Sequence, residues 1–267
     1  MGELVFIGLG LYNELDISLR GLKEIKTADA VFAELYTSLM AGLSMNKLEK
    51  MAEKKILVLT RHALEEEDGR AILEGARKGK AVLLVPGDAL IATTHMSLRI
   101  TAEKERIKTR VVHGASILSA AIGLSGLHNY KFGRSVTIPF PQEKFLPETP
   151  YEVIRKNKRS GLHTFCFLDV KAEEKRYMSI NEGLQTLLKI EKRRQQNVIT
   201  NKTLTVGIAR AGSSNLAVKA GFLNDVLNYD FGAPPHTLLI PGRLHFMEAE
   251  ALIAFGDAPQ TVRRLAK

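Results

Sequence analysis

Short runs of consecutive apolar residues alternate with longer segments in which apolar residues recur every three or four positions. The short runs are typical of buried strands, and in the first part of the chain they predict strands at 3–10, 30–35, 55–60 and 81–88. Segments 16–28 and 67–79 have the spacing of amphipathic helices. Asp16 or Ser18 would cap the first helix, and Gly79 would end the second. This alternation of strand and helix predicts a parallel sheet covered by helices on both faces.

The stretch 132–150 has a different character, because it contains four prolines and few periodic apolar residues. Beyond it, the pattern predicts strands at 163–170, 203–210 and 236–242, and helices at 150–158, 180–195, 214–222 and from about 245 onward. Ser179 and Glu182 would form a capping box at the start of the second of these helices. Proline-rich stretches without periodicity are typical of connections between domains. We therefore expect two α/β domains, residues 1–133 and 134–267.

The composition is typical of a globular protein, with 45% hydrophobic and 25% charged residues in a chain of 267. No apolar run approaches the roughly 18–20 residues of a membrane span, and no basic leader precedes the first strand. We therefore expect a soluble, cytoplasmic protein without a membrane partner. The single cysteine, Cys166, excludes a disulfide within the chain and a multi-cysteine metal site, so no metal is expected. Its apolar neighbours predict that it is buried.

The formal net charge is +9, which would attract nucleic acid, a nucleotide cofactor or an acidic protein. Most basic residues are scattered over the helical segments. One local cluster comprises Lys189, Lys192, Arg193 and Arg194. Cations are favoured at the C-terminal end of a helix, so a solvated helix end is the simpler interpretation of this cluster.

The segment GLGLYNELD (8–16) places two glycines directly after the first predicted strand. Glycines there would let the backbone approach a ligand closely. The third glycine of the dinucleotide fingerprint is absent, because Asn13 stands in its place, and the pyrophosphate interpretation is therefore weak. A plain turn from strand to helix remains an equal alternative.

The segment PGDALIATTH (86–95) is more specific, since it places an acid, two hydroxyls and an imidazole after a strand. In α/β sheets, ligands bind beyond the carboxyl ends of the strands. The carboxylate of Asp88 would accept hydrogen bonds from a hydroxyl or ammonium group of such a ligand. Thr93, Thr94 and His95 would either touch the ligand or cap the helix that follows.

Two further segments are candidates for the same site. HGASILSAA (113–121) places small residues at the start of an apolar helix, where the backbone of Ser116 and Ile117 would face a ligand. DFGAPPH (230–236) ends in His236, which would either contact a ligand or serve as a structural histidine. No Ser-His-Asp order, HExxH or Walker loop is present, and no catalytic residue can be named. The candidate site suits a bound cofactor better than hydrolysis.

Taken together, six segments resemble the diphthine synthase family: FIGLGLYNELDISLRGL, AELYTS, VPGDALIATTH, ASILSAAIGLSGLHNYKFG, GLHTFCFLDVK and DFGAPPHTLLIPGRLH. They follow one another from residue 6 to residue 245, so the resemblance covers nearly the whole chain. The family comprises S-adenosylmethionine-dependent methyltransferases of diphthamide biosynthesis, within the tetrapyrrole-methylase superfamily. The resemblance implies two α/β domains with a cleft between them, the class III methyltransferase fold, usually in a homodimer.

The activity that the resemblance implies is methylation of the amino group of a modified histidine, the 3-amino-3-carboxypropyl-histidine intermediate, on translation elongation factor two. Archaeal members are taken to add three methyl groups, and the spent cofactor is S-adenosylhomocysteine. The partner is a protein, with no direct nucleic acid contact. Cofactor contacts would fall on Leu11, Asp88, Ile91, Ser116, Ile117, Leu168, Ala211 and His236. Ala89 and Gly114 depart from the family pattern, which bears on local loop geometry.

Two alternatives stay open from the residues themselves. The first is a methyltransferase of the same superfamily that acts on a tetrapyrrole or on ribosomal RNA, for which the basic balance would be suitable. The second is a basic module that binds nucleotide or nucleic acid without catalysis.

Overall fold

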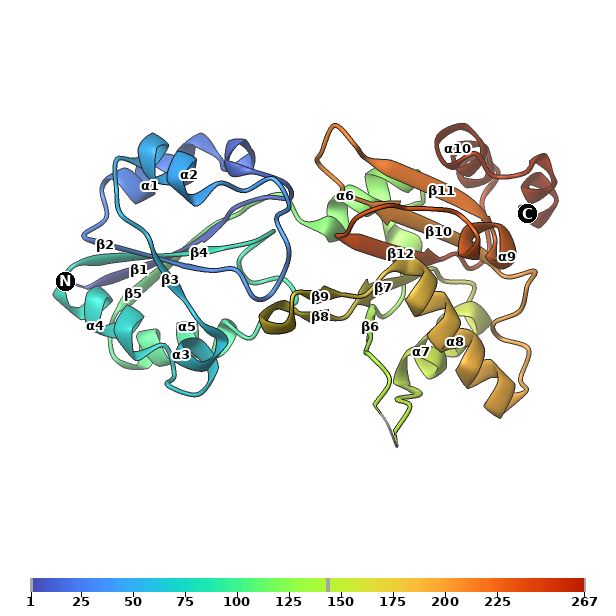
Figure 1. Cartoon of the computed structure of the whole chain (residues 1–267), viewed down its shortest axis with the longest axis horizontal. Helices are drawn as coiled ribbons and strands as arrows, with labels where there is room; N and C mark the ends of the chain where they lie inside the picture. The colour runs from blue at the N-terminus through green and yellow to red at the C-terminus, as the bar shows by residue number, and fades with distance from the viewer. Residues whose placement is uncertain (1, 143–144, 267) are drawn as a thin grey trace. The chain divides into compact units, whose positions relative to one another are not determined.

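The computed structural model describes residues 2–142 and 145–266. The chain divides into two compact units, residues 1–117 with 172–175 and residues 118–171 with 176–267. The first break lies at 117/118 and not at 133/134, because residues 118–133 group with the second unit. One contact that explains this grouping is that of Gly126, which lies directly against Ala251 in the last α-helix of that unit. Figure 1 shows the course of the chain through both units.

The first unit contains a five-stranded sheet in the order β3-β2-β4-β1-β5, in which every strand is parallel to its neighbours. Its strands are β1 (Glu3–Gly8), β2 (Ala30–Glu34), β3 (Leu57–Leu59), β4 (Lys80–Val85) and β5 (Lys108–Val112). Its helices are the short 3-10 turn η1 (Glu14–Asp16), α1 (Leu19–Lys26), α2 (Met45–Ala52), α3 (Arg61–Glu65), α4 (Arg70–Lys78) and α5 (Met96–Lys104). The predicted parallel sheet is confirmed, and Ser18 caps α1 as expected.

Helices cover both faces of this sheet, with α1 and α2 on one side and α3, α4 and α5 on the other (Figure 1). Alternate residues of β1 enter different cores: Phe6 packs with α4 and α5, whereas Ile7 packs with α1 and α2. The register pairs Gly8 with Val85 and Ile7 with Val112. The carboxyl ends of β4, β1 and β5 therefore meet at one edge of the sheet.

The second unit contains a mixed sheet in the order β11-β10-β12-β7-β6. Its strands are β6 (Val136–Ile138), β7 (Thr164–Leu168), β10 (Leu204–Ala209), β11 (Ala217–Phe222) and β12 (His236–Ile240), with a separate hairpin of β8 (Val170–Lys171) and β9 (Arg176–Tyr177). Its helices are α6 (Ile117–Ser125), η2 (Asn129–Lys131), α7 (Thr149–Arg159), α8 (Ile180–Arg194), α9 (Leu223–Leu227), α10 (Phe246–Gly256) and η4 (Gln260–Leu265). The turn η3 (Ala172–Glu174) follows β8 in sequence and groups with the first unit. A core formed by α7, α8 and α9 packs on one face of the sheet.

The helix predicted at 214–222 is wrong, because this segment forms strand β11. It pairs antiparallel with β10, with Val218 opposite Ile208 and Ala220 opposite Val206. A short segment of small and apolar residues fits the periodicity of a helix as well as that of a strand. Pairing with the neighbouring strand β10 then determines which of the two it forms. The stretch 132–150 likewise holds a strand, β6, where only a connection was expected.

Several local predictions are confirmed. Ser179 and Glu182 form the capping box of α8, and Gly79 ends α4. Cys166 is fully buried in β7. The basic cluster lies at the C-terminal end of α8, where Arg194 forms ion pairs with Glu148 and Glu152. Among the residues that the structure describes, no helix has the length and apolar character needed to span a membrane.

Candidate functional site

Four glycines bring together the loops that follow β1, β4 and β5. The N–H of Gly10 donates to the carbonyl of Gly87 at 3.2 Å, and the N–H of Gly87 donates back at 2.7 Å. A Cβ atom on Gly8 would lie 2.5 Å from the Gly87 carbonyl oxygen and 2.6 Å from the Gly114 nitrogen. A Cβ atom on Gly114 would lie 2.5 Å from the same oxygen. Gly114, a departure from the family pattern, thus permits backbone-to-backbone contact among the three loops.

The loop after β1 is held by Asp16, which was predicted as a possible helix cap. Its Oδ2 accepts hydrogen bonds from the backbone N–H groups of Leu11 (3.1 Å), Tyr12 (2.6 Å) and Asn13 (3.4 Å). Asn13 itself caps the turn η1. The N–H of Leu11 is therefore occupied, and Leu11 would offer a ligand its carbonyl oxygen and side chain.

Asp88 lies in the loop after β4 with its side chain only 10% exposed. Its Oδ2 is 2.8 Å from Nδ1 of His113, which directly follows β5. Within the described part of the chain, its Oδ1 receives only a long contact of 3.5 Å from the N–H of Leu90. The N–H of Ile91 donates to the carbonyl of Asp88 at 3.1 Å. One carboxylate oxygen of Asp88 therefore retains room to accept hydrogen bonds.

The three polar residues at the end of this loop bind to other parts of the protein. The hydroxyl of Thr93 donates to the Ala89 carbonyl at 3.0 Å, and that of Thr94 donates to Glu65 at 3.1 Å. His95 is buried with its Nε2 3.1 Å from Oε1 of the fully buried Glu34. None of these side chains forms the N-cap hydrogen bond of α5. They brace the loop after β4 against α3 and against the loop after β2.

Glu34 is the residue at the end of β2 that organises the segment AELYTS. Its carboxylate accepts hydrogen bonds from the N–H groups of Tyr36 at 3.0 Å and Thr37 at 3.1 Å, in addition to its contact with His95. The ring of Tyr36 meets that of His95 edge to face. Burial first, and then the negative charge of Glu34, raise the pKa of Tyr36. This network joins the end of β2 to the loop after β4. None of the predicted cofactor-binding residues takes part in it.

Ser116 and Ile117 lie where α6 begins, since Ile117 is its first residue. The first backbone N–H groups of a helix have no partner within the helix and are suited to bind an oxygen acceptor. Together with Leu11, Asp88 and Ile91, these residues follow the adjacent strands β1, β4 and β5 of the first sheet. The structure thus brings five of the predicted residues to one sheet edge.

The three remaining predicted residues share one edge of the second sheet. His236 begins β12 and pairs with Ala209, so Ala211 follows the end of β10 on the same side. Leu238 pairs with Cys166, and two residues further along that antiparallel register Leu168 falls across from His236. Leu168 and Ala211 are buried.

The ring of His236 is already hydrogen-bonded at both nitrogens. Its Nδ1 accepts from the N–H of Ile180 at 3.3 Å, so the proton lies on Nε2, which donates to the Ala233 carbonyl at 3.2 Å. Burial lowers its pKa, and the imidazole is therefore neutral at pH 7. Of the two interpretations of His236, the structure favours the structural one for the ring.

His113 is the polar residue of this edge that the sequence did not reveal. It occupies the same kind of position as Asp88, directly beyond the carboxyl end of a strand. The signal was hidden because β5 contains Lys108 and Arg110 and does not form an apolar run. Arg110 is bound to Glu3 and Glu24, so the strand is stabilised by ion pairs as well as by burial.

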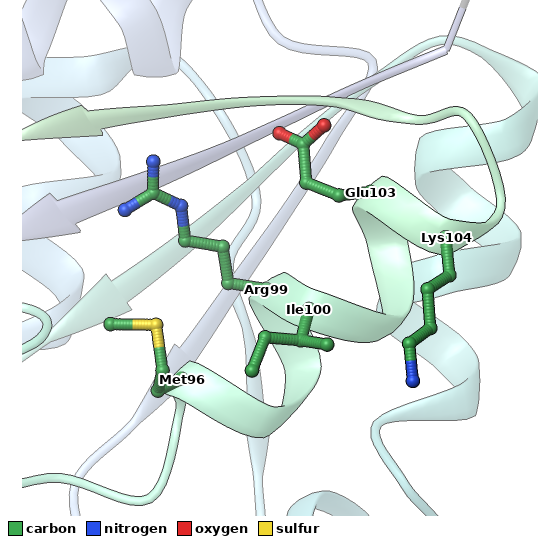
Figure 2. A pocket seen from close by; sticks show the side chains of 5 residues that line it. All are labelled: Met96, Arg99, Ile100, Glu103 and Lys104. Atoms are coloured by element: carbon green, nitrogen blue, oxygen red, sulfur yellow. The ribbon is translucent and has the colours of Figure 1, made fainter.

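A pocket outside this edge lies on the surface of α5 and is lined by Met96, Arg99, Ile100, Glu103 and Lys104 (Figure 2). Arg99 and Glu103 are both hydrogen-bonded to Thr109 of β5. None of the predicted site residues lines it. Among the residues that the structure describes, no group of three or more His, Cys, Asp or Glu side chains could hold a metal ion.

Comparison with known proteins identifies a family. Residues 3–226 match the model of the tetrapyrrole (corrin/porphyrin) methylases. The diphthine synthase of Methanosarcina mazei is 47% identical over 264 residues, 97% of this chain and 98% of that protein. The diphthine synthase of Methanocella arvoryzae is 47% identical over 249 residues, 93% of this chain and 96% of that protein.

Solved structures give the same result. A crystal structure of a diphthine synthase superimposes with a TM-score of 0.88 at 39% identity and covers 98% of this chain and 99% of that one. A putative diphthine synthase from Entamoeba histolytica has a TM-score of 0.87 at 38% identity, with 96% and 98% of the two chains covered.

Proposed function

Because the chain belongs to the tetrapyrrole methylase family and, within it, to the diphthine synthases, we propose that it methylates the 3-amino-3-carboxypropyl-histidine intermediate on translation elongation factor two. The observation that carries this proposal is 47% identity to a diphthine synthase over nearly the whole length of both chains. The acceptor is the amino group of the modified histidine, and the product is the trimethylated form. The active form is a homodimer in the cytoplasm.

The proposed methyl donor is S-adenosylmethionine, and residues at the edge of the first sheet suit it. The Oδ1 atom of Asp88 can accept hydrogen bonds from the hydroxyl or ammonium groups of such a molecule. Ile117, the first residue of α6, carries a backbone N–H of the kind that has no partner within its helix. The first-unit contacts would be Leu11, Asp88, Ile91, Ser116 and Ile117, and those of the second unit Leu168, Ala211 and His236.

The donor supplies a methyl group on a positively charged sulfur. Transfer of this group to nitrogen is an in-line displacement, which depends on the positions of the reacting atoms and on a neutral amine. The protein contributes by fixing these positions, an effect that can lower a barrier by roughly 7–11 kcal/mol. The rigid contact of Gly8, Gly87 and Gly114 supports such a role, because it fixes the loops that carry Asp88 and Ser116.

The decisive experiment offers the protein labelled S-adenosylmethionine with either of two acceptors. One is elongation factor two carrying the unmethylated intermediate, and the other is ribosomal RNA. We expect label on the factor, and mass spectrometry of the product should show an added mass of three methyl groups. Label on RNA alone would refute the proposed acceptor, and label on neither would refute methyl transfer to both.

A further inference from the structure

The contact between Asp88 and His113 determines which nitrogen of the His113 ring carries the proton. Nδ1 of His113 lies 2.8 Å from Oδ2 of the nearly buried Asp88. An ionised carboxylate only accepts hydrogen bonds, so Nδ1 must carry a proton. In the neutral ring the lone pair then lies on Nε2.

The imidazole is open to solvent on its other side, since the His113 side chain is 78% exposed. Within the described residues, no group forms a hydrogen bond with Nε2, and Asp88 is the one titratable partner of the ring. A buried carboxylate that fixes the tautomer of an imidazole, with the second nitrogen directed to the reacting group, is the arrangement by which proteins orient a general base.

Methylation of an amine requires that the amine first lose its proton, and a base can take that proton up. An α-amino group has a pKa of about 8 in solution, so at pH 7 most of it is protonated and has no lone pair. After each transfer the product amine carries a positive charge and must lose a proton before it can attack again. The addition of three methyl groups to an ammonium therefore releases three protons.

We propose that His113, oriented by Asp88, is the general base that deprotonates the acceptor amine. In each cycle the N–H bond of the ammonium breaks and its proton moves to Nε2 of His113. The freed electron pair forms the new N–C bond, while the C–S bond of the donor breaks and its pair stays on sulfur. The ring then returns its proton to solvent. This inference rests on the proposed function, because it assumes an amine acceptor.

The other histidines of the chain are not placed for this task. His95 and His163 are buried and engaged with Glu34 and Glu248. Both nitrogens of His236 are occupied. The remaining three are His62, which lies on α3 beside Glu66 and Glu67, and His128 and His245, which lie beside each other at the start of α10.

The substitution His113→Asn keeps the hydrogen bond to Asp88 and removes the base. The amide of Asn can still donate to Asp88 but has no basic nitrogen. With saturating donor and the unmethylated factor, we expect single-turnover methylation at pH 7 to slow about 10²–10⁴-fold. The loss should shrink as pH rises and the free amine loses its proton to solvent. Partially methylated products should accumulate in mass spectra. S-adenosylhomocysteine should bind within about twofold of the wild-type affinity.

Two companion variants sharpen the result. In His113→Ala, added imidazole should restore part of the rate, since the site of the ring is open to solvent. His62→Asn, at an exposed histidine outside the site, should leave the rate and its pH dependence unchanged.

A wild-type rate and pH profile in His113→Asn would overturn the role of His113, as would a loss that is equal at all pH values or that follows weakened cofactor binding. If the wild-type protein itself transfers no methyl group to the factor, the proposed function fails, and the role of His113 fails with it.

Discussion

At the scale of single residues, the two carboxylate oxygens of Asp88 have different roles. Oδ2 is engaged with His113, whereas Oδ1 has only a long contact to the Leu90 N–H. The side chain is nearly buried, so a hydrogen bond at Oδ1 forms with little competition from water. A ligand that donates to Oδ1 therefore gains a charge-assisted hydrogen bond.

Substitution of Asp88 by Ala should weaken cofactor binding by about 1.5–3 kcal/mol, the range of a hydrogen bond to a charged group. Calorimetric titration with S-adenosylhomocysteine measures this change directly. Asp68→Ala, on the loop before α4, serves as the control and should bind like the wild type. An affinity that is unchanged in Asp88→Ala would show that this carboxylate does not contact the cofactor.

Gly114 is a second residue whose effect can be argued from distances. An Ala at this position would place a Cβ atom 2.5 Å from the Gly87 carbonyl oxygen and 2.7 Å from that of Gly8. Both neighbours are backbone atoms, so the loops must separate, at a cost of about 1–3 kcal/mol.

The expected result is a lower thermal midpoint and weaker cofactor binding for Gly114→Ala. Gly123→Ala is the matched control, because Gly123 lies inside α6 with no atom near its missing Cβ. A helix favours Ala over Gly by about 0.5–1 kcal/mol, so this variant should be slightly more stable. Equal stability of Gly114→Ala and the wild type would contradict the close approach of the loops.

At the scale of elements, the start of α10 depends on one buried carboxylate. Glu248 accepts hydrogen bonds from the N–H groups of His245 and His128, and it contacts Lys131 and His163. Burial alone would raise the pKa of Glu248, but these hydrogen bonds lower it to about 2. A single side chain thus joins α10 to η2 and to the start of β7.

A carboxyl group whose pKa is lowered in the folded protein stabilises the fold above its unfolded pKa of 4.5, and this contribution is lost as pH falls toward 2. For Glu248 it amounts to about 3 kcal/mol at most. Denaturant unfolding of Glu248→Gln should therefore show a deficit near pH 6 that narrows toward pH 3. The control Glu250→Gln, also on α10, removes an exposed ion pair with Arg263 of η4 and should change little.

The elements also show what the sequence could and could not reveal. Strands β1, β2 and β4 are buried on both faces, and their continuous apolar runs were recognised. Strand β5 was missed, because Lys108 and Arg110 interrupt its pattern, and His113 was missed with it. Strand β11 was mistaken for a helix, since its period is decided by pairing with β10 and not by its own composition. Local sequence patterns thus revealed the strands whose own residues are mostly apolar, and they missed or misassigned the strands that depend on ion pairs or on a neighbouring strand.

At the scale of the whole molecule, the formal net charge of +9 bears on the encounter with the protein substrate. A net positive field accelerates association with an acidic surface, and salt screens it. The association rate with elongation factor two should therefore fall as ionic strength rises. Stopped-flow measurements between low and physiological salt test this, with S-adenosylhomocysteine binding as the comparison. An association rate that does not depend on salt would show that the net charge does not accelerate the encounter.

The whole-molecule prediction of two α/β parts was possible because strand and helix patterns alternate in both halves. The position of the break was not, since a contact such as that of Gly126 with Ala251 joins residues far apart in sequence. The candidate residues were likewise found loop by loop. Their convergence through Gly8, Gly87 and Gly114 follows from strand order, which the sequence does not state.

Cys166 gives the molecule a practical property. The only thiol of the chain is fully buried in β7, and burial raises its pKa, so it is neither accessible nor ionised in the native protein. A cysteine introduced at an exposed position of either unit would then be the one thiol to react with a spin label or fluorophore. Such a label would report on its own surroundings in the folded protein, with no need to remove a natural cysteine first.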